Sequence, residues 1–159
     1  NTSEGDARQM LLRLWNESWG DGIWVAAWSK AVADVGPVQA AWKPSPSIHS
    51  IWHNVHHVCI WREYTLVKLG LRKTPLREEV EARNFEAPAE TTAAAWQATC
   101  ARLRATHEAI RDAIESGQPA ERLHYHLPHD TYHLGQIMTL RAMQGFPPMN
   151  DWQAVLVTP

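Results

Sequence analysis

The sequence predicts an all-α fold, in which four main helices form a bundle. Stretches rich in Ala, Leu, Glu and Arg dominate the chain, whereas the alternation of apolar and polar residues that is typical of strands is rare. A long charged segment, residues 71–88, separates the second main helix from the third, as a crossover between two halves of a bundle would. The 159 residues suit one buried core, so residues 1–159 are expected to form a single domain.

The first half of the chain contains three expected helical stretches, of which the first two are separated by a short break. Residues 4–19 are expected to form a helix and residues 23–35 a second stretch, and Gly20, Asp21 and Gly22 interrupt them. A proline-rich loop follows Gly36 and Pro37. Ser47 is the expected N-cap of the next helix, which runs to about residue 69 before Gly70 stops it.

The second half is expected to hold the other two main helices, over residues 89–115 and up to residue 144. The start of the last helix is open, because Pro128 is either its first residue or the site of a kink in a helix that begins near Pro119. The tail from Phe146 is rich in proline and is expected to pack over the bundle.

Composition excludes several classes of function. The formal net charge is −2 and no basic run occurs, which argues against nucleic acid or an anionic membrane surface as partner. No apolar stretch reaches the roughly 20 residues that span a bilayer, and the N-terminus lacks the features of a secretory signal. Cys59 and Cys100 fall inside expected helices and form no disulfide framework. A cytoplasmic location is therefore expected.

Histidine is enriched in two clusters, which hold eight of the nine histidines: His49, His53, His56 and His57 in the first, and His124, His126, His129 and His133 in the second. His129 and His133 are one helical turn apart and share the stripe of Leu140, which faces the core. Two neighbouring buried imidazoles need partners, and a metal ion would satisfy both. A pair of core or surface histidines with ordinary hydrogen bonds is the alternative.

The first cluster offers a third ligand. His53 and His57 have the same four-residue spacing, and His57 lies nearer to the core stripe of its helix. Residue spacing alone leaves open both a three-histidine site with His57 and a four-histidine site with both pairs, which would close the coordination of the ion.

Two segments resemble motifs of the DinB/YfiT-like superfamily. Ser50-Ile51-Trp52-x-x-Val55-x-His57 with Trp61 is similar to its second-helix motif, and His129-Asp130-x-x-His133-x-Gly135-Gln136-Ile137 is similar to its last-helix motif. The resemblance covers about residues 40–145. It implies an up-down-down-up four-helix bundle in which His57, His129 and His133 bind a divalent ion, often nickel or zinc. His53 and His56 are unusual for the first motif.

The resemblance also guides the expected function. It implies a metal-dependent enzyme that acts on a small molecule, as a hydrolase or a small-thiol transferase, and family members are often homodimers. A metal-binding stress-response protein without catalysis is the alternative.

Further residues are candidates for supporting the ligands or lining the pocket: His53, Trp61, Asp130 and Gln136. Asp130 is expected to pair with a neighbouring imidazole, and Gln136 to orient water or substrate or to bond another helix. His107 is expected to be a buried, hydrogen-bonded histidine. His124 and His126 are expected at exposed loop positions, with support of the ligand histidines as the alternative. Arg141 is expected to form a surface salt bridge, with binding of an anionic substrate as the alternative.

Overall fold

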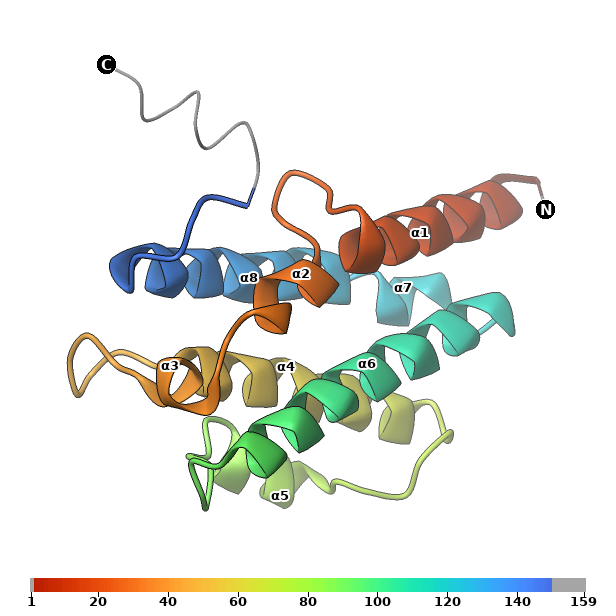
Figure 1. Ribbon diagram of the computed structural model, residues 1–159. Helices are drawn as coiled ribbons and strands as arrows, with labels where there is room; N and C mark the ends of the chain where they lie inside the picture. The colour runs from red at the N-terminus through yellow and green to blue at the C-terminus, as the bar shows by residue number, and fades with distance from the viewer. Residues whose placement is uncertain (1, 150–159) are drawn as a thin grey trace.

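The computed structural model describes residues 2–149, and these form helices and no strand. Four helices are long, and they lie side by side: α1 (Thr2–Gly20), α4 (Ile51–Lys68), α6 (Ala93–Glu115) and α8 (His126–Met143) (Figure 1). The prediction of an all-α fold is confirmed. No helix within this range is long and apolar enough to cross a membrane.

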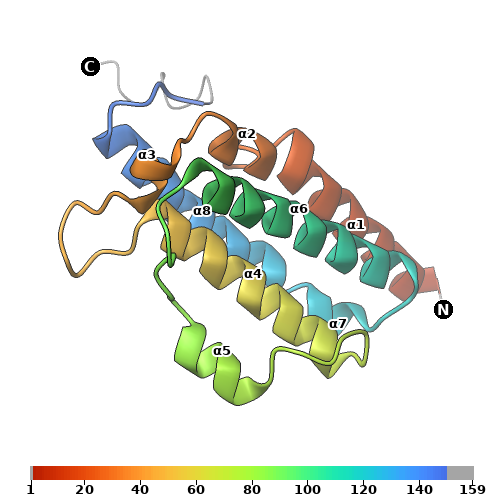
Figure 2. The ribbon, with the colours of Figure 1, turned by 60° about the horizontal axis from the view of Figure 1, so that its bottom comes forward.

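Short helices join the long ones: α2 (Trp28–Ala33), α3 (Pro37–Ala41), α5 (Arg77–Arg83) and α7 (Ala120–Leu123). The prediction of a helix over residues 23–35 is right only for α2. The chain turns sharply at Gly22, before α2, where φ is 83°. The turn requires glycine, because a Cβ at this position would lie 2.6 Å from the Val25 carbonyl oxygen. The region expected to be a proline-rich loop contains α3, and the crossover contains α5 (Figure 2).

The N-cap of α4 is Ser50 and not Ser47 as predicted. The Ser50 hydroxyl accepts a hydrogen bond from the His53 backbone N–H (3.1 Å), and the His53 ring Nδ1 lies 3.2 Å from the Ser50 backbone nitrogen. These reciprocal contacts satisfy donors that the first turn of a helix leaves free. Gly70, with a φ of 74°, follows the end of α4 as expected.

The last helix begins at His126, so neither predicted start is right. Pro128 lies in the first turn of α8, where its missing N–H breaks no hydrogen bond of the helix. The segment after Pro119 forms the separate helix α7.

The core lies where α4 packs against α6 and α8, and where α1 packs against α6. Trp15 and Trp28 are almost fully buried, and the free thiol of Cys59 in α4 is buried in the same core cluster as Trp28. Phe146 packs against the core as expected of the tail, but residues 150–159 lie outside the described residues.

Candidate metal centre

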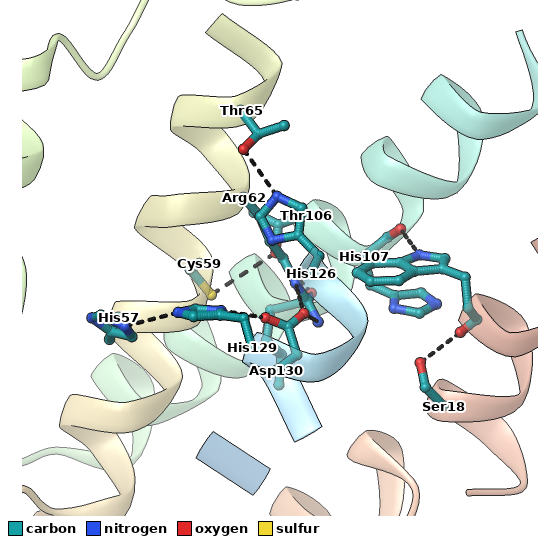
Figure 3. A network of polar contacts seen from close by, with 12 residues as sticks. Ser18, His57, Cys59, Arg62, Thr65, Thr106, His107, His126, His129 and Asp130 are labelled. Atoms are coloured by element: carbon teal, nitrogen blue, oxygen red, sulfur yellow. Dashed lines mark hydrogen bonds and ion pairs between the residues drawn. The ribbon is translucent and has the colours of Figure 1, made fainter. Parts of the chain in front are cut away.

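The helices α4 and α8 bring three histidines to one point. His57 comes from α4, and His129 and His133 come from successive turns of α8. One ring nitrogen from each lies within 4.8 Å of the others. The Nε2 atoms of His57 and His129 are 3.0 Å apart (Figure 3). The three residues therefore form the kind of cluster that could hold a metal ion.

Each of the three rings is held at Nδ1 by an oxygen acceptor. The acceptors are Asn84 Oδ1 for His57 (2.7 Å), Asp130 Oδ1 for His129 (2.9 Å) and Asn54 Oδ1 for His133 (2.8 Å). An imidazole nitrogen that faces such an oxygen carries the proton. Each Nε2 is thus left with its lone pair, the form in which histidine binds metals.

The two amide acceptors have defined orientations. The Asn54 amide nitrogen donates to the Ser50 carbonyl (2.9 Å), so the other amide atom is the oxygen that faces His133. The Trp61 indole N–H, which can only donate, lies 2.8 Å from the Asn84 atom that faces His57. This atom must be the oxygen.

The short distance between the Nε2 atoms of His57 and His129 fits a cation shared by the two rings. Two Nε2 lone pairs 3.0 Å apart repel each other unless a proton or a metal ion lies between them. Two imidazole nitrogens on one zinc-like ion, each at about 2.1 Å, are about 3.0 to 3.4 Å apart. The donor set and its geometry fit a divalent ion.

Aromatic rings shield one side of the cluster. Phe85, from the segment after α5, stacks on the His57 ring at 4.2 Å between centroids, and His49 stacks on Phe85 at 3.8 Å. His57 and His133 are buried, whereas the side chain of His129 is 32% exposed. The cluster is therefore open to solvent on the side of His129.

Burial keeps two of the imidazoles neutral. Burial, together with the charge of His129, lowers the pKa of His57 to about 4. Burial, together with the charges of His57 and His129, also lowers the pKa of His133 to about 4. At neutral pH both rings present a free lone pair, so protons do not compete with a metal there.

Asp130 is a buried carboxylate paired with a buried arginine. Burial opposes its ionisation, but the Arg62 charge and the hydrogen bond from His129 lower its pKa to about 2. Arg62 Nε donates to Asp130 Oδ2 (2.9 Å), and Nη2 lies 2.8 Å from the same oxygen. Asp130 thus accepts from His129 on one oxygen and from Arg62 on the other.

His126 is also part of this region, and it does not lie in the exposed loop where it was expected. It is buried at the start of α8, and its Nε2 lies 2.9 Å from the Thr65 hydroxyl. His126, His129 and Asp130 form a second group of potential ligand atoms within 4.8 Å. His126 and Asp130 are one helical turn apart, and this spacing could have indicated that His126 lies beside Asp130 in this group.

The remaining predicted residues lie around the cluster or away from it. Trp61 lies at the edge of His57, with ring centroids 6.3 Å apart. His53 caps α4 and lies outside the groups of potential ligand atoms found among the described residues. Gln136 is exposed, and it contacts neighbours within α8: its amide nitrogen donates to the Tyr132 hydroxyl (3.4 Å), and its side chain forms a hydrogen bond with His133.

Two expectations about charged or polar residues are wrong. Arg141 is buried (1% exposed) and bonds the Ala31 carbonyl and Asp34, so it forms no surface salt bridge. His107 is buried as predicted, but within residues 2–149 its Nδ1 has no hydrogen-bond partner. Its ring instead stacks on Trp15, with centroids 4.7 Å apart.

The sequence analysis missed Asn54, Asn84, Phe85 and Arg62. Only Arg62 had a local signal, since it lies on the core stripe between Val58 and Leu66 and so had to be buried. Asn84 and Phe85 reach the site from the crossover, and no pattern within that segment indicates which residues contact His57.

Fold and site together define an all-α protein with a partly buried cluster of three histidines on two neighbouring helices. The chain belongs to the DinB superfamily, whose family model matches residues 24–146. This match confirms the resemblance seen in the sequence motifs. No curated protein and no solved structure matches the chain significantly.

Proposed function

We propose that this protein binds one divalent metal ion, nickel or zinc, through His57, His129 and His133, and that it is a metal-dependent enzyme acting on a small molecule. The observation that carries the proposal is the 3.0 Å approach of the His57 and His129 Nε2 atoms, with all three Nδ1 atoms held by oxygen acceptors. Rings held in this way are prepared to receive a cation.

The number of ligands favours catalysis over a purely structural ion. Three protein ligands leave a coordination position open, whereas structural zinc sites are usually closed by four. The ring of His53 caps α4, which supports a site with three protein ligands. A bound divalent ion would supply Lewis acidity toward water, a carbonyl group or a thiol, which suits hydrolysis or thiol transfer.

The surroundings of His129 determine where a substrate would bind. Tyr132 and Gln136 are exposed on α8, and the Tyr132 ring lies 5.1 Å from that of His133. Their hydroxyl and amide groups can bond a polar substrate at the open side. Asp130 is not free to act as a general base, because Arg62 and His129 occupy both of its oxygens.

We propose the up-down-down-up arrangement, since α4 and α6 run in one direction in Figure 2 and α1 and α8 in the other. A homodimer is supported by the C-terminal half of the exposed face of α8, beyond the substrate side, which carries no charged side chain: Gly135, Thr139, Ala142 and Met143. Sedimentation of the purified protein as a monomer would contradict the dimer.

The catalytic part of the proposal is tested by a substrate screen. Protein loaded with zinc or nickel is assayed on activated esters, amides and thiol–electrophile pairs, with His57→Ala as the inactive control. We expect turnover that a chelator abolishes and one metal restores. Full metal occupancy without turnover of any substrate class would contradict the enzyme and leave a metal-binding protein.

A further inference from the structure

Arg62 is the most deeply buried charge near the histidine cluster, with a fully buried side chain. It lies on α4, and its guanidinium faces Asp130 on α8. We propose that Arg62 is a positioning residue of the metal centre, which anchors Asp130 so that Asp130 holds the His129 ring with Nε2 facing the ion. This inference rests on the proposed metal function.

The two oxygens of Asp130 have different partners. Nε and Nη2 of Arg62 lie 2.9 and 2.8 Å from Oδ2, whereas Oδ1 lies 2.9 Å from His129 Nδ1. Nε donates a hydrogen bond to Oδ2, whereas Nη2 forms an ion pair with the same oxygen and makes no hydrogen bond within the described residues. Oδ2 is thus anchored on Arg62, which leaves Oδ1 directed at the imidazole. Arg62 therefore determines the orientation of His129 through Asp130, which contacts both residues (Figure 3).

Arg62 is itself held by three other helices. Its Nη1 donates to the Leu103 carbonyl of α6 (3.3 Å), and its guanidinium lies 5.0 Å from the Trp15 ring of α1 and 5.7 Å from the Trp28 ring of α2. These contacts leave the guanidinium little freedom, because it packs among rigid core residues. The bundle core thus determines the position of one ligand of the site.

A purely structural role explains this ion pair poorly. Burial of an arginine and an aspartate has a high desolvation cost, and apolar residues of similar volume are often at least as stable. A comparison of His129 with His57 and His133 indicates what the Asp130 carboxylate adds to the binding of the ion. Their rings are held by the neutral amides of Asn84 and Asn54, which need no counter-ion, whereas a carboxylate makes an imidazole a stronger ligand.

Arg141 provides a matched control. It is the other fully buried arginine in the described residues, and it pairs with an aspartate, Asp34. Asp34 is 49% exposed and contacts no histidine in the described structure. A substitution at Arg141 therefore disturbs a buried arginine without reaching the metal centre.

The experiment measures Zn²⁺ affinity by competition with a chromophoric chelator, on variants that circular dichroism shows to be folded. Arg62→Met and Asp130→Asn are each expected to weaken binding by about 10- to 100-fold. Arg62→Met in the Asp130→Asn background should cause no further loss, because Arg62 acts through Asp130. Arg141→Met should leave the affinity unchanged.

A second readout reports the geometry of the site. The visible spectrum of Co²⁺-loaded protein should change in Arg62→Met and stay unchanged in Arg141→Met. If Arg62→Met does not fold, Arg62→Lys takes its place, because lysine keeps the charge but contacts Oδ2 with a single nitrogen. It should still weaken Zn²⁺ binding.

The outcomes separate this inference from the proposed function. Tight Zn²⁺ binding by the wild type with no loss in the Arg62 variants would overturn the positioning role alone. Independent losses that multiply in the double variant would also overturn it. A wild-type protein that binds no divalent ion would overturn both proposals.

Discussion

We predict that His107 destabilises the fold in acid. Its ring is buried, stacks on Trp15 and has an Nδ1 without a hydrogen-bond partner among residues 2–149. Burial, with a contribution from the positive charge of Arg62, lowers its pKa to about 3. The folded state therefore holds this ring neutral at pH values at which the unfolded chain protonates it.

The sign and size of the effect follow from proton linkage. The pKa in the unfolded chain is about 6.5, so between pH 6.5 and about 3 the unfolded state binds one proton more than the folded state. The contribution of His107 to stability is complete above pH 6.5 and is lost as the pH falls through this window. The loss is about 1.4 kcal/mol per pH unit, or about 2 kcal/mol between pH 7 and pH 5.

Urea denaturation of the metal-free protein at pH 7 and pH 5 tests this value against His107→Phe. Phenylalanine keeps a flat ring on Trp15, and the backbone carbonyl of residue 107 still accepts the Trp15 indole N–H (2.9 Å). The other buried histidines are present in both proteins, so their effects cancel. The wild type should lose about 2 kcal/mol more than the variant on acidification. Equal losses would refute the reasoning.

Further predictions concern the ligands and the helix that carries two of them. His57→Ala should abolish retention of the metal, whereas His53→Ala should keep it, and equal losses would point to a four-histidine site. Asn84→Ala should weaken Zn²⁺ binding by about tenfold, because it removes the acceptor that orients His57. Gly135→Ala should raise the unfolding free energy by up to about 1 kcal/mol, since a Cβ there meets open space and alanine favours helix; a lower melting temperature would contradict this.

The long helices could be predicted from the sequence because their apolar residues recur with helical spacing. Their ends were less accessible, since several residues offer the same capping chemistry. Ser47 and Ser50 are both suitable N-caps, and only the reciprocal contact with His53 selects Ser50. The apolar spacing over residues 23–35 predicted one helix, but α2 begins only at Trp28. The turn at Gly22 brings the chain against the backbone of Val25 and Ala27, so residues 23–27 form no helix.

The pair of His129 and His133 was accessible for a similar reason, because helical spacing places them one turn apart on one face. The choice of His57 came mainly from the resemblance to the superfamily motif. The groups that orient the three rings were not accessible, because Asn84 and Asn54 act across different elements. The burial of charged residues was also underestimated. Arg141 was expected at the surface because it is charged, but it lies on the buried face of α8. Its partner Asp34 is distant in sequence, so no local pattern indicated the pair.

Elemental analysis of the purified protein tests the central claim most directly. The chain is prepared with supplemented nickel or zinc, dialysed and analysed beside His57→Ala. The account predicts about one divalent ion per wild-type chain and almost none in the variant. A wild-type protein that retains no ion, or a variant that retains as much as the wild type, would contradict it.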